Sequence, residues 1–473
     1  MQDRTIALCV DLDGTLIRSD LLVESALALL RRNPLYIFRF GSWLLRGKAH
    51  LKREIAVRTS VDVSTLPYEP RVLNWLRSET SGRRRVLCTA SDHKFADAVA
   101  AHVGGFDEVL ASDGVRNLSG RNKAAVLGDR FGERGFDYAG NEVRDLHVWK
   151  RARRAIVVNA PQGLAQRAGR VSEVERVFER EGSGLRASLR ALRLHQWLKN
   201  LLVFLPLLTA HLVLAPNAVL HTTIAFFSFC LCASGVYLLN DLLDLDADRR
   251  HPRKRLRPFA DGRLPLVSGL IAAPLLTLAA FALALAISPL FAAVLLAYFV
   301  LTVAYSFALK RIAMLDTLVL AALYTIRIIA GTAALGIPPS FWLLAFSVFL
   351  FLSLAMIKRY TELAVLLRSG EVRSLGRGYS VEDLPLVQSL GGSSGYLAVL
   401  VLALYINSTA SEVLYSRPVV LWLLCPLLLY WISRAWLIAH RGDMHDDPVV
   451  FAVSDWVSRL TLVLAIIIVV GAI

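Results

Sequence analysis

Charged residues are scarce in this sequence. Asp, Glu, Lys and Arg make up 19% of its 473 residues, and 55% of the residues are hydrophobic, whereas soluble proteins average roughly 25% charged residues. This composition excludes a chain that is soluble throughout. The shortage is also uneven, because the sequence is rich in Arg up to about residue 192 and then continues as apolar segments of membrane-spanning length. We therefore expect a soluble part followed by a membrane part.

Cysteine is infrequent too, and no cleavable signal peptide is recognisable. The cysteines show neither metal-ligand nor disulfide spacing, and we interpret them as small apolar residues: Cys9, Cys88, Cys230, Cys232 and Cys425. The first residues lead directly into an apolar strand, TIALCVDLD. Without a signal peptide, the soluble part is expected to stay in the cytoplasm.

Acidic residues are outnumbered by basic ones, which gives a net charge of +15. The basic residues lie mostly in the soluble part and in alternate loops of the membrane part, so membrane topology explains them better than nucleic-acid binding does. We predict a multi-pass protein of a bacterial inner (plasma) membrane with a cytoplasmic N-terminal domain. About nine spanning segments are expected, at 198–215, 218–239, 265–286, 289–308, 313–334, 340–358, 393–409, 418–437 and 453–472.

The apolar run TIALCVDLDGTLI (5–17) ends in two alternate acids. A buried strand of this kind places Asp11 and Asp13 on the same side, at the carboxyl end of a sheet, where α/β folds bind ligands. Gly14 allows the chain to turn sharply after them. The alternative is a plain Asp-Gly turn without a ligand.

Further segments extend this pattern. RRRVLCTASD (83–92) predicts a second buried strand, and Lys123 lies near the start of a helix. FDYAGN (136–141) predicts another strand, and AIVVNAP (155–161) is expected to form the last one. Strands that alternate with helices indicate an α/β domain with a parallel sheet.

In this order, the segments resemble the haloacid dehalogenase (HAD) superfamily of phosphatases. The resemblance covers residues 1–165, as a Rossmann-like α/β domain with an inserted helical cap at about 18–75. It implies that Asp11 is the nucleophile, which forms an aspartyl-phosphate. It also implies that Asp13 is the general acid and base.

The same resemblance implies the remaining site residues. Thr89 and Lys123 would hold the phosphoryl oxygens. The ligands of a Mg²⁺ ion would be Asp11, Asp13, Asn141 and Asp145. Asn141 stands where the superfamily often has an aspartate, and its amide oxygen can ligate Mg²⁺ with one less negative charge. We therefore expect a reduced metal affinity or activity.

Residues 166–195 are expected to form an amphipathic linker. EVERVFERE (173–181) is expected to begin it as a charged helix that breaks at Gly182 to Gly184. The chain then resumes as a basic helix with its leucines broadly on one side, the pattern of a helix at a membrane interface.

A dense group of charges follows the second expected spanning segment, in YLLNDLLDLDADRRHPRKRLRPFADG (237–262). If a helix continues through its first half, one face carries Asn240, Asp241, Asp244 and Asp248. Asp246 then points away. Carboxylates this close repel one another, and carboxylate and amide oxygens suit Mg²⁺ with a phosphate-rich ligand. The bases that follow are candidates for further phosphate contacts: His251, Lys254 and Arg257.

The spacing NDxxDxxxD resembles the first aspartate motif of the UbiA family of intramembrane prenyltransferases, which binds Mg²⁺ and a diphosphate. The resemblance covers residues 196–473, as an all-α membrane domain of about nine transmembrane helices. HQWLKN (195–200) is similar to the decaprenyl-phosphate 5-phosphoribosyltransferase branch. The second aspartate motif of the family, DxxxD, is missing. Basic residues in its region favour an anionic second substrate.

Basic and aromatic residues near these motifs are assigned to substrate contacts. Arg327 lies well within a spanning segment, where a charged side chain is expected to face a cavity. For Lys199, near a helix start, a snorkelling role is the alternative. The full set is Lys199, Asn200, His251, Lys254, Arg257, Tyr305, Lys310, Tyr324, Arg327, Lys358, Arg359 and Glu362.

The two resemblances together imply a function. The membrane part would transfer 5-phosphoribose from phosphoribosyl diphosphate to a polyprenyl phosphate, such as decaprenyl phosphate. The fused phosphatase would remove the 5-phosphate, giving polyprenyl-phosphoryl-ribose for the synthesis of cell-envelope arabinose or ribose donors. Two alternatives stay open: an aromatic prenyltransferase of the 4-hydroxybenzoate type that uses a prenyl diphosphate, and a non-catalytic membrane scaffold or transporter with a degenerate phosphatase domain.

Overall fold

The computed structural model describes residues 6–79, 82–180, 184–369, 377–444 and 448–473. The chain folds as two compact units. Unit 1 comprises Met1–Leu192 and Tyr237–Ala273, and unit 2 comprises Arg193–Val236 and Pro274–Ile473. Unit 1 therefore contains both the N-terminal α/β part and the loop that carries the aspartate motif.

Unit 1 is built on a parallel sheet of six strands in the order β3-β2-β1-β4-β5-β6. The strands are β1 (Ala7–Val10), β2 (Arg85–Asp92), β3 (Glu108–Ser112), β4 (Phe136–Gly140), β5 (Arg154–Val158) and β6 (Glu173–Phe178). Successive strands run outward on one side of β1 up to β3, and β4 then pairs on its other side. The carboxyl ends of β1 and β4 thus meet at the point where the strand order reverses, which is where open α/β sheets bind ligands.

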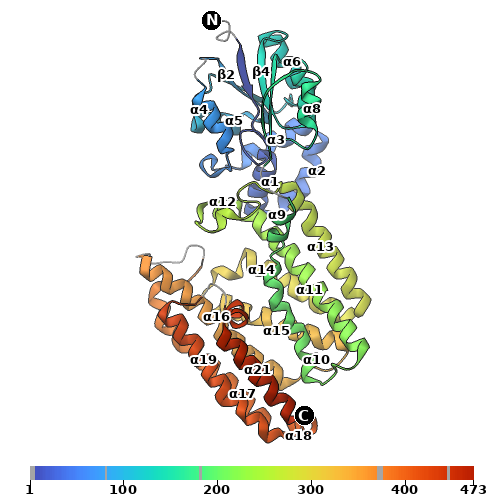
Figure 1. The fold of residues 1–473 in the computed structure, drawn as a ribbon, viewed down its shortest axis with the longest axis vertical. Helices are drawn as coiled ribbons and strands as arrows, with labels where there is room; N and C mark the ends of the chain where they lie inside the picture. The colour runs from blue at the N-terminus through green and yellow to red at the C-terminus, as the bar shows by residue number, and fades with distance from the viewer. Residues whose placement is uncertain (1–5, 80–81, 181–183, 370–376, 445–447) are drawn as a thin grey trace. The chain divides into compact units, whose positions relative to one another are not determined.

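Helices cover both faces of this sheet, as parallel sheets require. Leu8 and Val10 face a core that includes α4 (Pro70–Ser78) and α5 (His93–Val103). The alternate residue Cys9 faces the opposite core. That second core is completed by α6 (Arg121–Phe131), α7 (Leu146–Trp149) and α8 (Leu164–Gly169), and Figure 1 shows α4 and α5 on the opposite side of the strands from α6 and α8.

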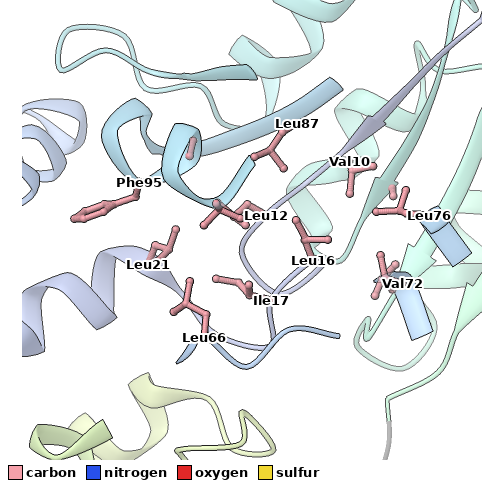
Figure 2. Packing of buried hydrophobic residues seen from close by; sticks show 14 of the residues in the cluster. Val10, Leu12, Leu16, Ile17, Leu21, Leu66, Val72, Leu76, Leu87 and Phe95 are labelled. Atoms are coloured by element: carbon pink, nitrogen blue, oxygen red, sulfur yellow. The ribbon is translucent and has the colours of Figure 1, made fainter. Parts of the chain in front are cut away.

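The turn that follows β1 is anchored by apolar side chains. Leu12, Leu16 and Ile17 are fully buried. Figure 2 shows them packed with residues of α4 and α5 and with Leu66, in the same cluster as Val10. Since Leu12 separates Asp11 from Asp13, burial of its side chain fixes the backbone between the two acids.

The chain between β1 and β2 forms the expected helical insertion. Its helices are α1 (Leu21–Arg32), α2 (Ile37–Leu45) and α3 (Lys48–Arg58), followed by α4. Asp20 caps α1 by accepting a hydrogen bond from the backbone N–H of Val23. Pro70 starts α4 at its first position, where its missing N–H is harmless.

The segment EVERVF (173–178), expected as the start of a charged helix, is strand β6. It pairs in parallel with β5, so the strand of AIVVNAP is not the last one of the sheet. Val174 and Phe178 are half-buried, while the charged residues between them are exposed at the sheet edge, where natural sheets commonly place charge. The second expected helix is present as α9 (Gly184–Ala191), with Leu185 and Leu189 exposed.

The aspartate motif begins in the last turns of α11 (Pro216–Leu243), and the residues of α11 from Tyr237 onward belong to unit 1. The chain continues through α12 (Leu245–Arg250) and the short helix η6 (Lys254–Leu256) into α13 (Leu266–Ile287). Helix α12 contacts η3 (Val63–Thr65) of the insertion. The loop is thus packed against the cap of the α/β part.

Unit 2 is helical. Its elements are η5 (Leu194–Phe204), α10 (Leu205–Thr209), α14 (Pro289–Phe307), η7 (Leu309–Arg311), α15 (Leu315–Leu335), α16 (Phe341–Ser369), η8 (Val381–Asp383), α17 (Leu384–Ile406), α18 (Thr409–Leu414), η9 (Pro418–Leu423), α19 (Leu424–Arg441), α20 (Pro448–Ser454) and α21 (Trp456–Ala472), with parts of α11 and α13. Among the described residues, buried side chains of this unit gather in apolar clusters, one of them between α11, α14 and α15.

Within the described residues, seven helices are long and apolar enough to cross a membrane, rather than the nine expected. They are Pro216–Leu243, Leu266–Ile287, Pro289–Phe307, Leu315–Leu335, Phe341–Arg368, Val381–Ile406 and Pro418–Arg441. The last expected segment is the shorter helix Trp456–Ala472. The first, 198–215, is broken into η5 and α10. Pro206 lies in the first turn of α10, and His211, with a φ of 56°, follows the end of α10. The chain is a multi-pass membrane protein.

Candidate active sites

The first candidate site lies at the carboxyl end of β1. Asp11 follows the strand, and one of its carboxylate oxygens, Oδ1, accepts hydrogen bonds from the backbone N–H of Leu12 at 2.9 Å and from Nζ of Lys123 at 2.8 Å. Lys123 comes from the first turn of α6 and is buried with Asp11. The structure thus brings together the two residues that the sequence assigned to nucleophile and phosphoryl binding.

Asp13 is held by the start of α1 and the end of β2. Its Oδ1 accepts a hydrogen bond from the backbone N–H of Leu21 at 2.8 Å, and its Oδ2 accepts one from the hydroxyl of Ser91 at 2.6 Å. Thr89 Oγ1 lies 3.4 Å from the same oxygen. Ser91 was not among the predicted site residues, although it lies two positions beyond Thr89 on the same strand.

Gly14 is required by the close approach of Asn141. Its φ is +73°, and a Cβ atom at this position would lie 2.0 Å from Nδ2 of Asn141. The amide oxygen of Asn141 accepts a hydrogen bond from Thr15 Oγ1 at 3.3 Å. The predicted metal ligand Asn141 therefore sits directly over the turn that carries Asp11 and Asp13.

Asp145 closes the site from η4 (Val143–Asp145), the short helix that follows β4. Its Oδ2 accepts hydrogen bonds from the backbone N–H groups of Asn141 and Glu142, each at 2.9 Å, and its Oδ1 accepts one from the Tyr138 hydroxyl at 3.0 Å. The same hydroxyl accepts a hydrogen bond from Nζ of Lys123 at 2.8 Å. Tyr138 thus links Lys123 to Asp145. Nothing in the sequence pointed to Tyr138, because a tyrosine in a buried strand is usually a core residue.

The surroundings of the two motif acids affect their protonation in opposite ways. Burial raises the pKa of Asp11, although the charge of Lys123 opposes the rise. Burial, together with the charge of Asp20, raises the pKa of Asp13. Lys123 thus favours the carboxylate of Asp11 that a nucleophile needs, and Asp20 favours the protonated form of Asp13 that a general acid needs.

The donors at this site suit Mg²⁺. In the parts of the chain that the structure describes, no three His, Cys, Asp or Glu side chains converge as a ligand set. Mg²⁺ usually takes only one or two carboxylates and completes its shell with waters and substrate phosphate. Asp11, with the neighbouring Asn141 amide and Asp145, meets that requirement.

The second candidate site is the aspartate motif. The expected continuous helix is wrong, because Asp244 (φ −99°, ψ 15°) separates α11 from α12. The spacing of the motif nevertheless persists, since Asp244 N–H donates to the carbonyl of Asn240 at 2.9 Å and Asp248 N–H donates to that of Asp244 at 2.8 Å. Asp241 and Asp248 are 2% and 3% exposed.

Arg257 joins the two buried acids of the motif. Its Nη1 lies 3.1 Å from Asp241 Oδ1 and 2.6 Å from Asp248 Oδ2. Burial raises the pKa of Asp248, and the charge of Arg257 opposes that rise. Asp241 and Asp248 thus converge on one cationic atom, and carboxylate oxygens are ligands that suit Mg²⁺. Among the described residues, Asp244 does not complete a converging set of three acids with them.

The remaining acids and bases of this loop face outward or toward the insertion. Asp246, whose side chain is 48% exposed, pairs with Arg250 at 3.1 Å. Asp244 lies 3.4 Å from Arg31 of α1. His251 and Lys254 are both exposed, and nearby Lys254 adds to burial in lowering the pKa of His251.

A cluster in unit 2 contains four of the predicted substrate residues. Arg327 of α15 donates from Nε to Asn200 Oδ1 at 2.8 Å, and its guanidinium lies over the ring of Tyr324 at 5.8 Å. Nζ of Lys199 lies 5.8 Å from the same ring. The sequence missed Tyr298, whose hydroxyl accepts a hydrogen bond from Arg327 Nη2 at 3.1 Å. The intramembrane charge is therefore surrounded by polar and aromatic partners, as expected.

A second polar cluster of unit 2 surrounds Arg359. Its guanidinium pairs with Asp316 at 2.5 Å, both side chains being fully buried, and also with Glu362. The Tyr379 hydroxyl donates to Asp316 at 2.8 Å, and Tyr305 hydrogen-bonds with Arg359. The sequence did not single out Asp316 as the partner of Arg359, because the two lie on different helices. The predicted residues Lys310 and Lys358 are half-buried.

The sequence matches the model of a known protein family. Residues 203–470, more than half of the chain, match the model of the UbiA prenyltransferase family. The chain belongs to the UbiA prenyltransferase family. The matched region begins within η5 and contains the aspartate motif, the Arg359 cluster and most of the Arg327 cluster. Lys199 and Asn200 of the Arg327 cluster lie just before it. The sheet of unit 1 lies outside it.

Several relatives of this UbiA-family chain are known. The uncharacterized protein y4nM of Sinorhizobium fredii is 37% identical over 96% of the chain and 88% of its own length. The nodulation protein NoeC of Azorhizobium caulinodans is 40% identical over 56% of the chain and 86% of its own length. The decaprenyl-phosphate phosphoribosyltransferase of Mycolicibacterium smegmatis is 36% identical over 44% of the chain and 66% of its own length.

Proposed function

We propose that this chain transfers 5-phosphoribose from phosphoribosyl diphosphate to a polyprenyl phosphate, such as decaprenyl phosphate, and then removes the 5-phosphate. The transfer step rests on the convergence of Asp241 and Asp248 on one cationic atom of Arg257. The similarity to a decaprenyl-phosphate phosphoribosyltransferase supports the choice of substrates. We place the reaction at the cytoplasmic face of a bacterial inner membrane, with the α/β part in the cytoplasm.

In the transfer step, a phosphate oxygen of the polyprenyl phosphate forms a bond to C1 of the ribose. The bond from C1 to the diphosphate oxygen breaks, and diphosphate leaves with the electron pair. No proton is moved, because the attacking oxygen is already ionised. Mg²⁺, when bound, neutralises charge on the leaving group. The residues that would hold it are Asn240, Asp241, Asp244 and Asp248.

Cationic side chains are proposed to bind the phosphates. Arg257 forms ion pairs with Asp241 and Asp248, so its guanidinium is placed to contact a diphosphate held at these two acids. In unit 2, Lys199 and Arg327 both make cation–π contacts with the Tyr324 ring. We propose that these two side chains bind the polyprenyl phosphate. Arg359 is fully buried with Asp316, and a positioning role is proposed for it.

The second step is proposed for the β1 site. The carboxylate of Asp11 attacks phosphorus, the bond from phosphorus to the ribose O5 breaks, and Asp13 gives its proton to that oxygen. A water then attacks the aspartyl-phosphate and returns a proton to Asp13, which releases inorganic phosphate and restores Asp11. Lys123, 2.8 Å from Asp11, offsets the negative charge of the phosphoryl group.

A prenyl diphosphate reaction with an aromatic acceptor is the second candidate. The family to which the chain belongs is named for prenyl transfer, and the aspartate motif would hold a prenyl diphosphate equally well. This reaction leaves the β1 site without a substrate, because neither its donor nor its product carries a sugar phosphate.

The full chain in lipid nanodiscs would separate the two candidates. With phosphoribosyl diphosphate, decaprenyl phosphate and Mg²⁺, it should release one diphosphate and one inorganic phosphate per turnover. Asp11→Asn should abolish only the inorganic phosphate and accumulate the 5-phosphorylated lipid. Product formation from 4-hydroxybenzoate and a prenyl diphosphate, without diphosphate release from phosphoribosyl diphosphate, would contradict the proposal.

A further inference from the structure

The pocket beside Asp13 has a wall that comes from the transferase loop. A cavity of about 530 Å³ is lined by residues of the β1 site, among them Asp13, Gly14 and Asn141, and by residues at and just before the start of α13. The latter are Gly262, Arg263, Pro265, Leu266 and Val267. Both sets of residues belong to unit 1. A substrate whose phosphate reaches Asp13 therefore also lies against the segment that starts α13.

This wall is fixed by close packing at Gly262. Its φ is +76°, and a Cβ atom there would lie 2.5 Å from Cβ of Arg18 and 3.0 Å from the Arg18 carbonyl oxygen. Arg18 itself pairs with buried Glu69 at 2.9 Å. The loop thus approaches the catalytic turn as closely as backbone allows, and only glycine permits this approach.

A buried ion pair supports the same contact. Arg249 donates from Nη1 to Glu24 at 3.0 Å, and its Nε donates to the carbonyl of Ala260 at 2.8 Å. Ser19, which lines the cavity, donates to Glu24. In Figure 1, α12, which carries Arg249, lies beside α1, which carries Glu24. The wall is therefore held by a defined network.

The cavity is lined by charged side chains of both signs. Besides Asp13, it has two further acids, Asp20 and Glu142, and four arginines: Arg18, Arg144, Arg180 and Arg263. Arg18 pairs with Glu69 and Arg263 with Asp261. Leu266 and Val267 add an apolar patch, and Val267 is 46% exposed. They are the first residues of α13, a helix apolar enough to cross a membrane. The cavity thus brings together an acid of the β1 site, several arginines and the apolar start of α13.

From this arrangement we infer that residues 262–267 select a lipid-linked phosphomonoester as the substrate of the β1 site. The monoester would lie at Asp13, a second phosphate in the chain to the lipid would lie by Arg263, and the first lipid carbons would lie on Leu266 and Val267. The inference rests on the proposed phosphatase step and adds what that step does not require: discrimination in favour of the lipid-linked ester over a soluble sugar phosphate.

Two substrates test the inference on the full chain in detergent micelles. One is ribose 5-phosphate, and the other is farnesyl-phosphoryl-ribose 5-phosphate, which adds the second phosphate and a short prenyl chain. The readout is the ratio of kcat/KM for the farnesyl substrate to that for ribose 5-phosphate. The wild-type ratio should be at least about tenfold, and Arg263→Ala should remove most of it, because a charge-assisted hydrogen bond is lost.

Two further variants sharpen the test. Gly262→Val should also lower the ratio, because the added side chain pushes the loop away from Arg18. Arg255→Ala is the matched control: it removes an exposed arginine of the same loop that does not line the cavity, and should leave the ratio within about twofold. If Gly262→Val does not fold, Arg263→Ala alone decides.

Each other result has a defined meaning. Equal kcat/KM values for the two substrates in the wild type, or an unchanged ratio in Arg263→Ala, would overturn the inference and leave the phosphatase step intact. Failure of the wild type to hydrolyse either ester, or hydrolysis that survives Asp11→Asn, would overturn the phosphatase step and the inference with it.

Discussion

Glu24 and Arg249, which are 225 positions apart in the chain, form a buried two-point ion pair. Their side chains are 5% and 6% exposed, and the two contacts measure 2.5 and 3.0 Å. Glu24 belongs to the insertion of the α/β part, and Arg249 follows the aspartate motif by one position. This pair therefore connects the part of the chain with the β1 site to the part with the transferase motif.

Removing one partner of this pair should be costly. Glu24→Ala leaves the charge of Arg249 buried without its partner, and breaking such a pair costs about 3–5 kcal/mol. The double variant Glu24→Ala/Arg249→Ala should be less destabilised than the sum of the single variants. Denaturant unfolding of the full chain in detergent measures these differences.

An exposed pair provides the comparison. Arg84 and Glu108 lie 2.8 Å apart, and the Arg84 side chain is 51% exposed. Arg84→Ala should cost at most about 1 kcal/mol, since solvent screens the pair. If Glu24→Ala costs no more than Arg84→Ala, the contact between the insertion and α12 is not a stable part of the fold.

The stability of unit 1 should depend on pH through Glu69. Burial alone would raise its pKa, but hydrogen bonds from Arg71, Arg18 and Asn159 lower the pKa of Glu69 to about 2. Because the folded-state pKa is depressed from an ordinary value of 4.5, the stabilisation is complete above about pH 4.5 and is lost as the pH falls toward 2. It amounts to about 3 kcal/mol.

Glu69→Gln tests this dependence. The difference in unfolding free energy between the variant and the wild type should be largest at pH 6 to 8, which lies above the ordinary glutamate pKa of about 4.3, and should shrink as the pH falls below it. Glu133→Gln, at a side chain that is 60% exposed, should change the free energy by less than about 0.5 kcal/mol. A Glu69→Gln penalty that stays constant down to pH 3 would show that the charge of Glu69 is not its source.

The acids of the aspartate motif should differ in their importance for transfer. Asp241→Asn and Asp248→Asn should each lower diphosphate release from phosphoribosyl diphosphate by at least about 100-fold, because each removes a carboxylate proposed to hold the metal. Asp246→Asn removes the same charge from the exposed side chain and should change the rate by less than about threefold. Equal losses in all three variants would indicate general electrostatic repulsion rather than a metal site.

Asn141→Asp should strengthen metal binding at the β1 site. The substitution adds a carboxylate beside Asp145 and the turn that carries Asp11, and ligand charge tunes the affinity for Mg²⁺. The dissociation constant for Mg²⁺, measured by calorimetry with the transferase acids replaced, should fall about tenfold. Asn141→Ala is the control and should not lower it. An unchanged constant in Asn141→Asp would exclude this side chain from the metal shell.

The sequence predicted which residues lie together within each local motif. Asp11, Asp13 and Gly14 follow from a short apolar run that ends in acids, and the structure brings them together with Lys123 as expected. The face shared by Asp241 and Asp248 follows from helical spacing alone, and it survives the break at Asp244 because the backbone hydrogen bonds continue across it.

What the sequence could not predict depends on contacts between distant segments. Strand β6 looks like a charged helix by composition, and its pairing with β5 overrides that local preference. Tyr138, Tyr298 and Asp316 are ordinary residues of buried elements until their partners come from elsewhere. The first expected spanning segment is apolar enough to cross a membrane, but it is interrupted at Pro206 and at His211, which has a positive φ.

The close fit of Gly262 against Arg18 also limits how this protein can be divided. A chain that begins after residue 192 would keep Arg249 and the 260–262 turn but lose Glu24 and the backbone on which that turn rests. An isolated transferase half would therefore present a new unpaired charge and a bare surface beside its own catalytic acids. Its loss of activity would then reflect a damaged loop, and complementation by two separately expressed halves would require them to re-form this contact.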